Sequence, residues 1–162
     1  MDGKRLYVMA GFDSDTERLL ASIQEELNHL GFVGEQTKAI PPHITLADFD
    51  IDKESELVES LGMISKKHSV FKISFSHVGI FQGSRVLFIA PDVNKDLLDL
   101  KGYFGSSHNW AAHVTLLIDD PLVIQSAVPP ILARFRAFEG RIESLFLYEF
   151  WPTRFVASSR LG

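Results

Sequence analysis

A four-residue pattern of histidine, an apolar residue, threonine and leucine occurs twice in this 162-residue chain. The two copies are HITL at residues 43–46 and HVTL at residues 113–116, so they are 70 positions apart (113 − 43). A second pair of landmarks, Phe81 and Phe150, is 69 positions apart (150 − 81). A nearly constant offset between two sets of landmarks indicates an internal repeat.

The repeat predicts how the chain is organised. We expect a single two-lobed domain over residues 1–162, with duplicated halves at roughly 1–90 and 91–162 related by a pseudo-twofold axis. The turn sequences FQGSR and FWPTR begin at the second pair of landmarks, and they place Arg85 and Arg154 at equivalent positions of the two halves.

Hydrophobic periodicity predicts a leading strand and then helix, strand, helix and hairpin, twice. The first helix follows a strand at residues 6–12. We assign its N-cap to Ser14, in a capping box with Glu17, and its end to Gly31. The other expected strands cover 43–49, 71–81, 85–90, 112–118, 141–151 and 154–159, and the other expected helices cover 53–67, 94–104 and 120–135.

This order predicts an α+β fold with antiparallel sheets lining a central cleft and helices outside. Pro121 suits the first turn of the last helix. Pro129 and Pro130 are expected to kink or split that helix, because proline lacks the backbone donor and its ring crowds the preceding turn.

Composition narrows the class of protein. The net charge of −5 argues against a surface that wraps a long tract of nucleic acid. The absence of cysteine excludes disulfides and thiolate metal sites. No secretory signal and no run of about 20 apolar residues is present. We therefore expect a cytoplasmic monomer without membrane contact. No cluster of His, Asp and Glu has metal-ligand spacing, so no metal or other cofactor is expected.

The two motifs place chemistry on strands. Residues two apart on a strand share a face and lie about 7 Å apart along it. His43 and Thr45 should therefore point into the cleft together, as should His113 and Thr115, and pseudo-twofold symmetry would bring the pairs face to face. One imidazole could accept a proton while the other donates one to a leaving oxygen. The threonine hydroxyls could hold phosphate oxygens.

A His-x-Thr-Leu motif in each half resembles the two-histidine phosphoesterase superfamily, which includes 2′-5′ RNA ligase-like and RNA 2′,3′-cyclic phosphodiesterase proteins. The run PPHITL at residues 41–46 and the chain length are also similar to this family. The resemblance implies metal-free hydrolysis of 2′,3′-cyclic phosphates of nucleotides or RNA ends. It assigns His43 and His113 as catalytic and Thr45 and Thr115 as phosphate-binding residues.

Two other functions stay open at this point. Some members of the family join RNA halves through a 2′-5′ bond, and others bind nucleotides without turnover. Members named for ligation often carry an arginine two residues after the second motif's leucine, where this chain has Ile118. Further candidates for substrate contact are Arg85 and Arg154, through phosphate, and Phe49 and Trp151, through base stacking.

Overall fold

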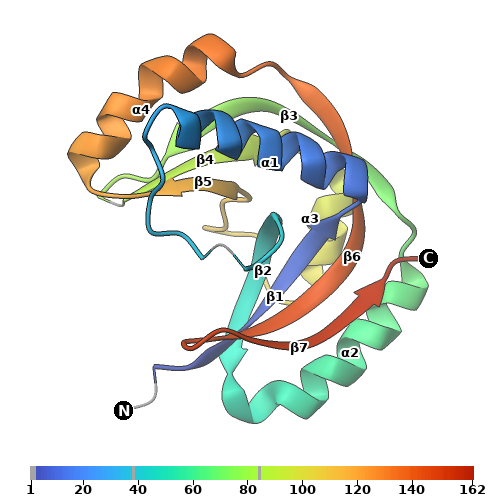
Figure 1. The fold of residues 1–162 in the computed structure, drawn as a ribbon. Helices are drawn as coiled ribbons and strands as arrows, with labels where there is room; N and C mark the ends of the chain where they lie inside the picture. The colour runs from blue at the N-terminus through green and yellow to red at the C-terminus, as the bar shows by residue number, and fades with distance from the viewer. Residues whose placement is uncertain (1–2, 38, 84) are drawn as a thin grey trace.

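The computed structural model describes residues 3–37, 39–83 and 85–162 (Figure 1). Ser84, in the turn of the first expected hairpin, lies outside the described residues. The helices are α1 (Ser14–His29), α2 (Glu54–Lys67), α3 (Lys95–Gly102) and α4 (Pro121–Arg134), with a short 3₁₀ helix at Ile51–Lys53. The strands are β1 (Arg5–Phe12), β2 (His43–Asp50), β3 (Phe71–Ile80), β4 (Val86–Pro91), β5 (Val114–Ile118), β6 (Phe138–Phe150) and β7 (Arg154–Arg160).

The described strands form one antiparallel sheet of seven strands in the order β2-β1-β6-β3-β4-β5, with β7 also paired to β6. Strand β6 is shared. Its residues 138–142 pair with β3, whereas residues 144–149 pair with β7 and the stretch from 142 onward pairs with β1. The predicted α+β class with antiparallel strands and outer helices is confirmed.

Strand pairing shows how the two halves of the sequence meet. Strand β2, which begins at His43, lies in the same part of the sheet as the C-terminal hairpin β6–β7. Strand β5, which follows His113, pairs with β4 of the β3–β4 hairpin. Each motif strand is therefore grouped with a hairpin from the other half. The boundary between duplicated halves near residue 90 stays a prediction.

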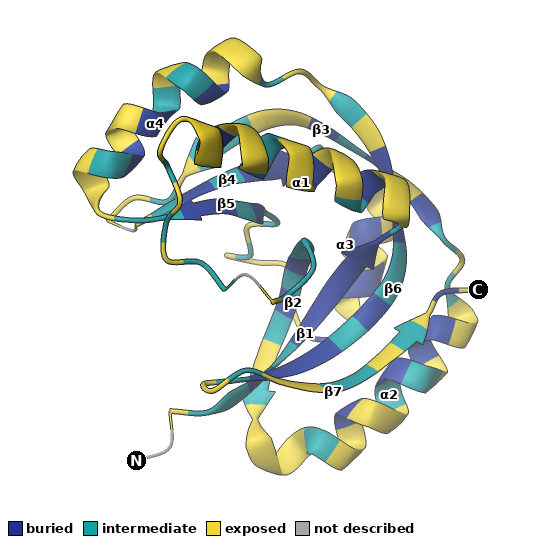
Figure 2. Cartoon of the chain, in the orientation of Figure 1, coloured by how far each residue is buried: buried dark blue, intermediate teal, exposed yellow. Residues whose placement is uncertain are grey.

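The core lies between the sheet and the helices. Strands β1 and β6 carry its most enclosed residues, including Leu6, Val8, Leu145 and Leu147, which have no exposed surface. Helix α2 packs on β6 and β7, while α1 packs on β5, β6 and α4. Figure 2 shows buried positions along the central strands and on the inner faces of the helices, with exposed positions on the outer helix faces.

The N-cap of α1 is Asp13 and not Ser14, so that expectation is wrong. The Asp13 carboxylate accepts hydrogen bonds from the backbone N–H and the hydroxyl of Thr16. A carboxylate at this position also interacts favourably with the positive end of the helix dipole. Ser14 is therefore the first helical residue.

Helix α4 begins at Pro121 as expected, but it runs to Arg134 without the split expected at Pro129 and Pro130. Ile124, Ala127 and Ile131 recur on one buried face of this helix. Their burial offsets the backbone hydrogen bonds that the two prolines remove.

Strand β5 begins at Val114, two residues later than expected, so His113 precedes the strand. The ring of His113 forms a hydrogen bond with the carbonyl of Ala111 in the segment that leads into the strand. Within the described residues, no helix is both long and apolar enough to cross a bilayer.

Candidate active site

His43 is the first residue of β2, and it lies opposite Gly11 of β1. A Cβ atom on Gly11 would overlap the Phe146 ring, so the absence of a side chain here lets Phe146 pack against β1. The His43 Nδ1 lies 2.9 Å from the Pro41 carbonyl oxygen. A carbonyl only accepts hydrogen bonds, so Nδ1 carries the hydrogen and Nε2 is the basic nitrogen of the neutral ring.

His113 is held in the same way. Its Nδ1 lies 2.8 Å from the carbonyl oxygen of Ala111, again two residues before the histidine. The ring meets Phe81 edge-on, with centroids 4.7 Å apart, and it lies 5.4 Å from the Phe88 ring. The internal repeat therefore extends from the residue types to the hydrogen bond that fixes each imidazole tautomer.

Both motifs also contain an extra residue at the leucine position. In β2, Thr45 pairs with Met9 and Ala47 pairs with Val8, which leaves Leu46 as the additional residue. In β5, Thr115 pairs with Phe88 and Leu117 pairs with Leu87, which leaves Leu116 as the additional residue. Bulges of this kind change the direction of neighbouring side chains and occur often beside active sites.

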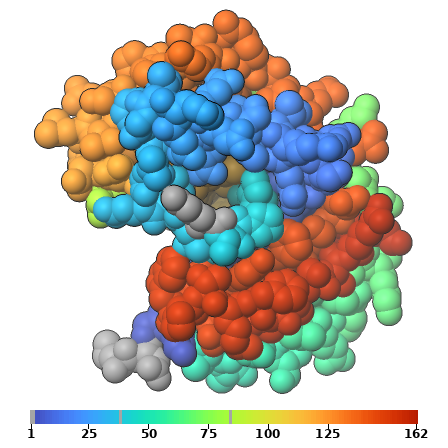
Figure 3. Space-filling view, viewed as in Figure 1, coloured from blue at the N-terminus to red at the C-terminus, as the bar shows by residue number. Residues whose placement is uncertain are grey.

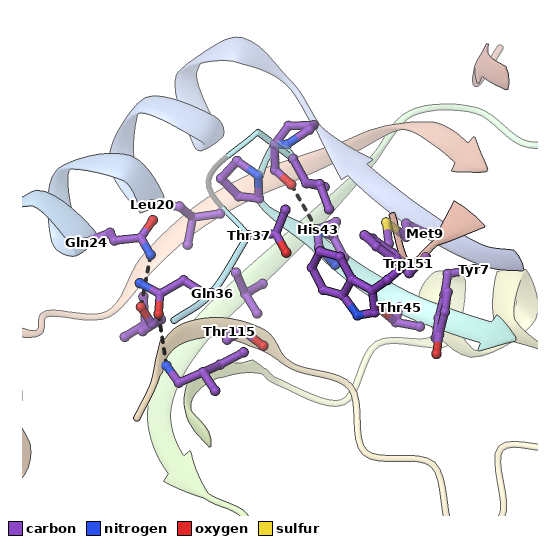
Figure 4. A pocket seen from close by; sticks show the side chains of 17 residues that line it. Tyr7, Met9, Leu20, Gln24, Gln36, Thr37, His43, Thr45, Thr115 and Trp151 are labelled. Atoms are coloured by element: carbon purple, nitrogen blue, oxygen red, sulfur yellow. Dashed lines mark hydrogen bonds between the residues drawn. The ribbon is translucent and has the colours of Figure 1, made fainter. Parts of the chain in front are cut away.

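A pocket of about 300 Å³ lies between the two motif strands and is lined by His43, Thr45 and Thr115. In Figure 3 the surface is hollowed between the α1–α4 part of the molecule and the β6–β7 hairpin. Figure 4 shows His43 and Thr45 on one side of the pocket and Thr115 on the other. His113 is placed beside the pocket; its two following residues line the pocket, whereas its own ring does not.

Burial lowers the pKa of the His43 imidazole below its ordinary value of 6.5, and the positive charge of protonated His113 lowers it further. The hydrogen bond to Pro41 opposes both effects. The His113 imidazole is therefore close enough for its charge to affect the protonation of His43. At neutral pH, His43 is held as a free base.

We expect a ¹H–¹³C NMR titration to give His43 a pKa below 6.5, because burial disfavours the imidazolium. In His113→Gln the pKa of His43 should rise, since a neighbouring positive charge is lost. The pKa of His43 is lower in the folded state than in the unfolded state. The contribution of neutral His43 to the free energy of unfolding is therefore complete above pH 6.5 and is lost as the pH falls through the folded-state pKa. A His43 that titrates at or above 6.5 in the wild type would contradict this account.

The two candidate arginines form ion pairs with carboxylates and do not face the pocket. Arg85 forms ion pairs with Glu35 and Asp120, both at 3.1 Å. Arg154 forms ion pairs with Glu54 and Glu149, and these carboxylates raise the pKa of its guanidinium. Neither arginine lines the pocket. Their equivalent positions in the sequence therefore correspond to equivalent ion pairs beside the start of β4 and of β7.

The two candidate aromatic residues differ in placement. Trp151, in the β6–β7 turn, lines the pocket and is 63% exposed. Phe49 does not line the pocket and packs on the core, edge-on to Phe104 at 6.5 Å. The structure thus brings Trp151 to the motif residues and leaves Phe49 away from them.

Several residues around the pocket were not anticipated from the sequence. Gln24 of α1 donates a hydrogen bond to the Leu116 carbonyl, and Gln36 accepts one from the Ile118 N–H. Both glutamines and Ile118 line the pocket. The sequence around the two glutamines contains no motif. They could have been found only by asking which side chains satisfy the free backbone groups of the edge strand β5.

In the described part of the chain, no three His, Asp or Glu side chains are grouped so that they could hold a metal ion. The antiparallel sheet has a tautomer-fixed His-x-Thr motif at the start of each of the edge strands β2 and β5. A sequence model of the 2′-5′ RNA ligase superfamily matches residues 12–150. The chain belongs to this superfamily, as the resemblance of its two motifs implied.

Solved structures agree on the fold over nearly the whole chain. The protein TT0787 of Thermus thermophilus has a TM-score of 0.66 at 14% identity, covering 97% of each chain. A structure described as a phosphoesterase has a TM-score of 0.61 at 19% identity, covering 99% of each chain. E. coli LigT complexed with ATP has a TM-score of 0.60 at 18% identity, covering 98% of this chain and 97% of LigT. No curated protein sequence matches the chain significantly.

Proposed function

We propose that this protein is a metal-independent phosphodiesterase that opens 2′,3′-cyclic phosphates of nucleotides or RNA ends. One observation carries the proposal. Two imidazoles whose Nδ1 atoms are both bonded to backbone carbonyls lie close enough to interact electrostatically, beside a pocket that Thr45 and Thr115 line from opposite sides. Such a pair can take up and release a proton in one step.

We assign the general base to His43 and the general acid to His113. The neutral His43 takes a proton from water through Nε2 as the water oxygen forms a bond to phosphorus. One ring P–O bond breaks, and the protonated His113 donates its Nε2 proton to the departing ribose oxygen. The products are a phosphomonoester and a free ribose hydroxyl. The lowered pKa of His43 suits the base, because the free base is the form present at neutral pH.

The threonine hydroxyls complete the site by donating hydrogen bonds to the non-bridging oxygens of the phosphate, where negative charge develops. We place the nucleoside in the rest of the pocket. Trp151 offers an exposed ring on which a base could stack. E. coli LigT has been solved in complex with ATP, 3′-AMP and NADP⁺, which supports a nucleotide as the ligand here.

The test is hydrolysis of a nucleoside 2′,3′-cyclic phosphate in the presence of EDTA, followed by ³¹P NMR. We expect the cyclic phosphate signal to be replaced by that of a phosphomonoester. Activity that EDTA abolishes and a divalent cation restores would overturn the metal-independent mechanism. Calorimetric binding of nucleotides without turnover of any cyclic phosphate would favour a binding module instead.

The family name also raises 2′-5′ ligation of RNA. Position 118, where members named for ligation often carry arginine, holds an isoleucine whose backbone bonds to Gln36 and Glu35 and which lines the pocket. This apolar residue supports hydrolysis over ligation. Incubation with RNA half-molecules, analysed on a gel, should give no joined product.

Thr45→Val and Thr115→Val should each lower kcat/KM for the cyclic phosphate by about 10- to 100-fold, because a hydrogen bond to a charged group contributes about 1.5–3 kcal/mol. Valine keeps the shape of threonine and removes only the hydroxyl. Steady-state kinetics would measure the loss. The matched control is Thr153→Val, in the β6–β7 turn outside both motifs. Full activity in both motif variants would contradict the assigned role.

A further inference from the structure

The loop before His113 is attached to the strand that carries the other motif. The indole Nε1 of Trp110 donates a hydrogen bond to the Thr45 carbonyl oxygen at 3.0 Å. Trp110 is three residues before His113, and Thr45 is two residues after His43. A single hydrogen bond thus connects the two His-x-Thr motifs across 65 residues of sequence.

The accepting carbonyl lies on an edge strand. Strand β2 ends the sheet, so among the described residues its outer side has no strand partner. An unpaired backbone carbonyl at a partly buried edge is costly unless a side chain or water satisfies it. The indole N–H does so, and the Thr45 carbonyl belongs to the residue just before the bulge at Leu46.

The Trp110 ring is itself held by contacts with α3 and the core. Residues 105–109 of the preceding loop are exposed, and Trp110 is the first residue of that loop to pack against the core. Lys101 of α3 is only 6% exposed, and its Nζ lies 5.7 Å from the centroid of the Trp110 ring. A cation at this distance from an indole face is attracted to it, more strongly where water is excluded.

The internal repeat is broken at this position. Both histidines bond to the carbonyl two residues before them, but the residue three before His43 is Ile40. Isoleucine has no side-chain donor and cannot reach across in the same way. Of the two segments that precede the histidines, the one before His113 is therefore the one that is hydrogen-bonded to the opposite motif strand, through Trp110.

We propose that Trp110 is a positioning residue that fixes the His113 loop against β2 and so sets the separation and orientation of the two imidazoles. The proposal rests on the paired-histidine function. Trp110 acts through Thr45 and His113 and does not itself line the pocket. Loss of the indole N–H should therefore leave nucleotide binding nearly unchanged and reduce the rate of the chemical step.

The first test is Trp110→Phe, which keeps an aromatic ring and removes the donor. We expect kcat for a cyclic phosphate to fall by about 10- to 100-fold with KM changed by less than about threefold, because small misplacement of catalytic groups costs this much. The matched control is Phe104→Leu, which disturbs the core under the same loop without touching the hydrogen bond. Equal losses of kcat in the two variants would show a merely structural role.

The second test does not depend on turnover. The rise in the His43 pKa caused by His113→Gln, measured by NMR, reports how close the two imidazoles are. This rise in pKa should be smaller in a Trp110→Phe background than in the wild type. Lys101→Met, which leaves Trp110 in place, should reduce the rise only partly. An unchanged rise in both backgrounds would overturn the proposal. An inactive wild type with the expected change in coupling would instead overturn only the proposed function.

Discussion

Alanine at either His43 or His113 is expected to lower kcat/KM for a nucleoside 2′,3′-cyclic phosphate by about 10²-fold or more. The expected loss is large because each imidazole moves a different proton. Without His43 no group removes the proton of the attacking water, and without His113 the ribose oxygen leaves unprotonated. Single-turnover kinetics with enzyme in excess would measure the chemical step directly.

The double variant gives a sharper result than either single one. Because both protons move in one step, the loss in His43→Ala/His113→Ala should be close to that of the worse single variant and well short of the product of the two losses. His29→Ala, at the exposed end of α1, is the matched control and should keep full activity. Wild-type rates in either single variant would show that the paired-imidazole mechanism is wrong.

Phe75→Ala is expected to lower the free energy of unfolding by about 3–5 kcal/mol, the usual loss when a large aromatic residue is removed from a core. The Phe75 side chain has no exposed surface, and its ring contacts those of Phe12 and Phe138 at 5.8 and 5.0 Å. It therefore joins β1, β3 and β6 at the centre of the sheet. Urea unfolding followed by circular dichroism would measure the change.

The size of this loss matters, because a domain of this size has about 5–15 kcal/mol of stability in total. Leu122→Ala is the control, since this side chain on α4 is 76% exposed and its truncation should change stability by no more than about 0.5 kcal/mol. A Phe75→Ala variant as stable as the control would mean that the packing around β3 and β6 differs from the one described.

Much of the fold follows from local signals in the sequence. The strand at His43, the hairpin β3–β4 and the Asn94-capped helix α3 are confirmed, because each rests on periodicity or a cap that tertiary contacts did not override. The two His-x-Thr pairs can also be recognised in the sequence. The same motif occurs twice, once in each of two predicted strands, and such a repeat constrains the fold strongly.

Other features depend on contacts that no local pattern records. The extra residues at Leu46 and Leu116 appear only when strand register is known. The grouping of β2 with the C-terminal hairpin is a matter of topology, which the order of elements alone leaves open. Nothing in the sequence distinguishes Trp110 from any other aromatic residue in a loop, because its hydrogen-bond partner, the Thr45 carbonyl, is 65 residues away.

The measurement that tests the central claim most directly is a crystal structure of the protein with a nucleoside vanadate, a mimic of the five-coordinate phosphorus. Nε2 of His43 and of His113 should each lie within about 3.2 Å of a vanadate oxygen, on opposite sides of the vanadium. Vanadate bound to only one imidazole, or bound away from both, would contradict the account.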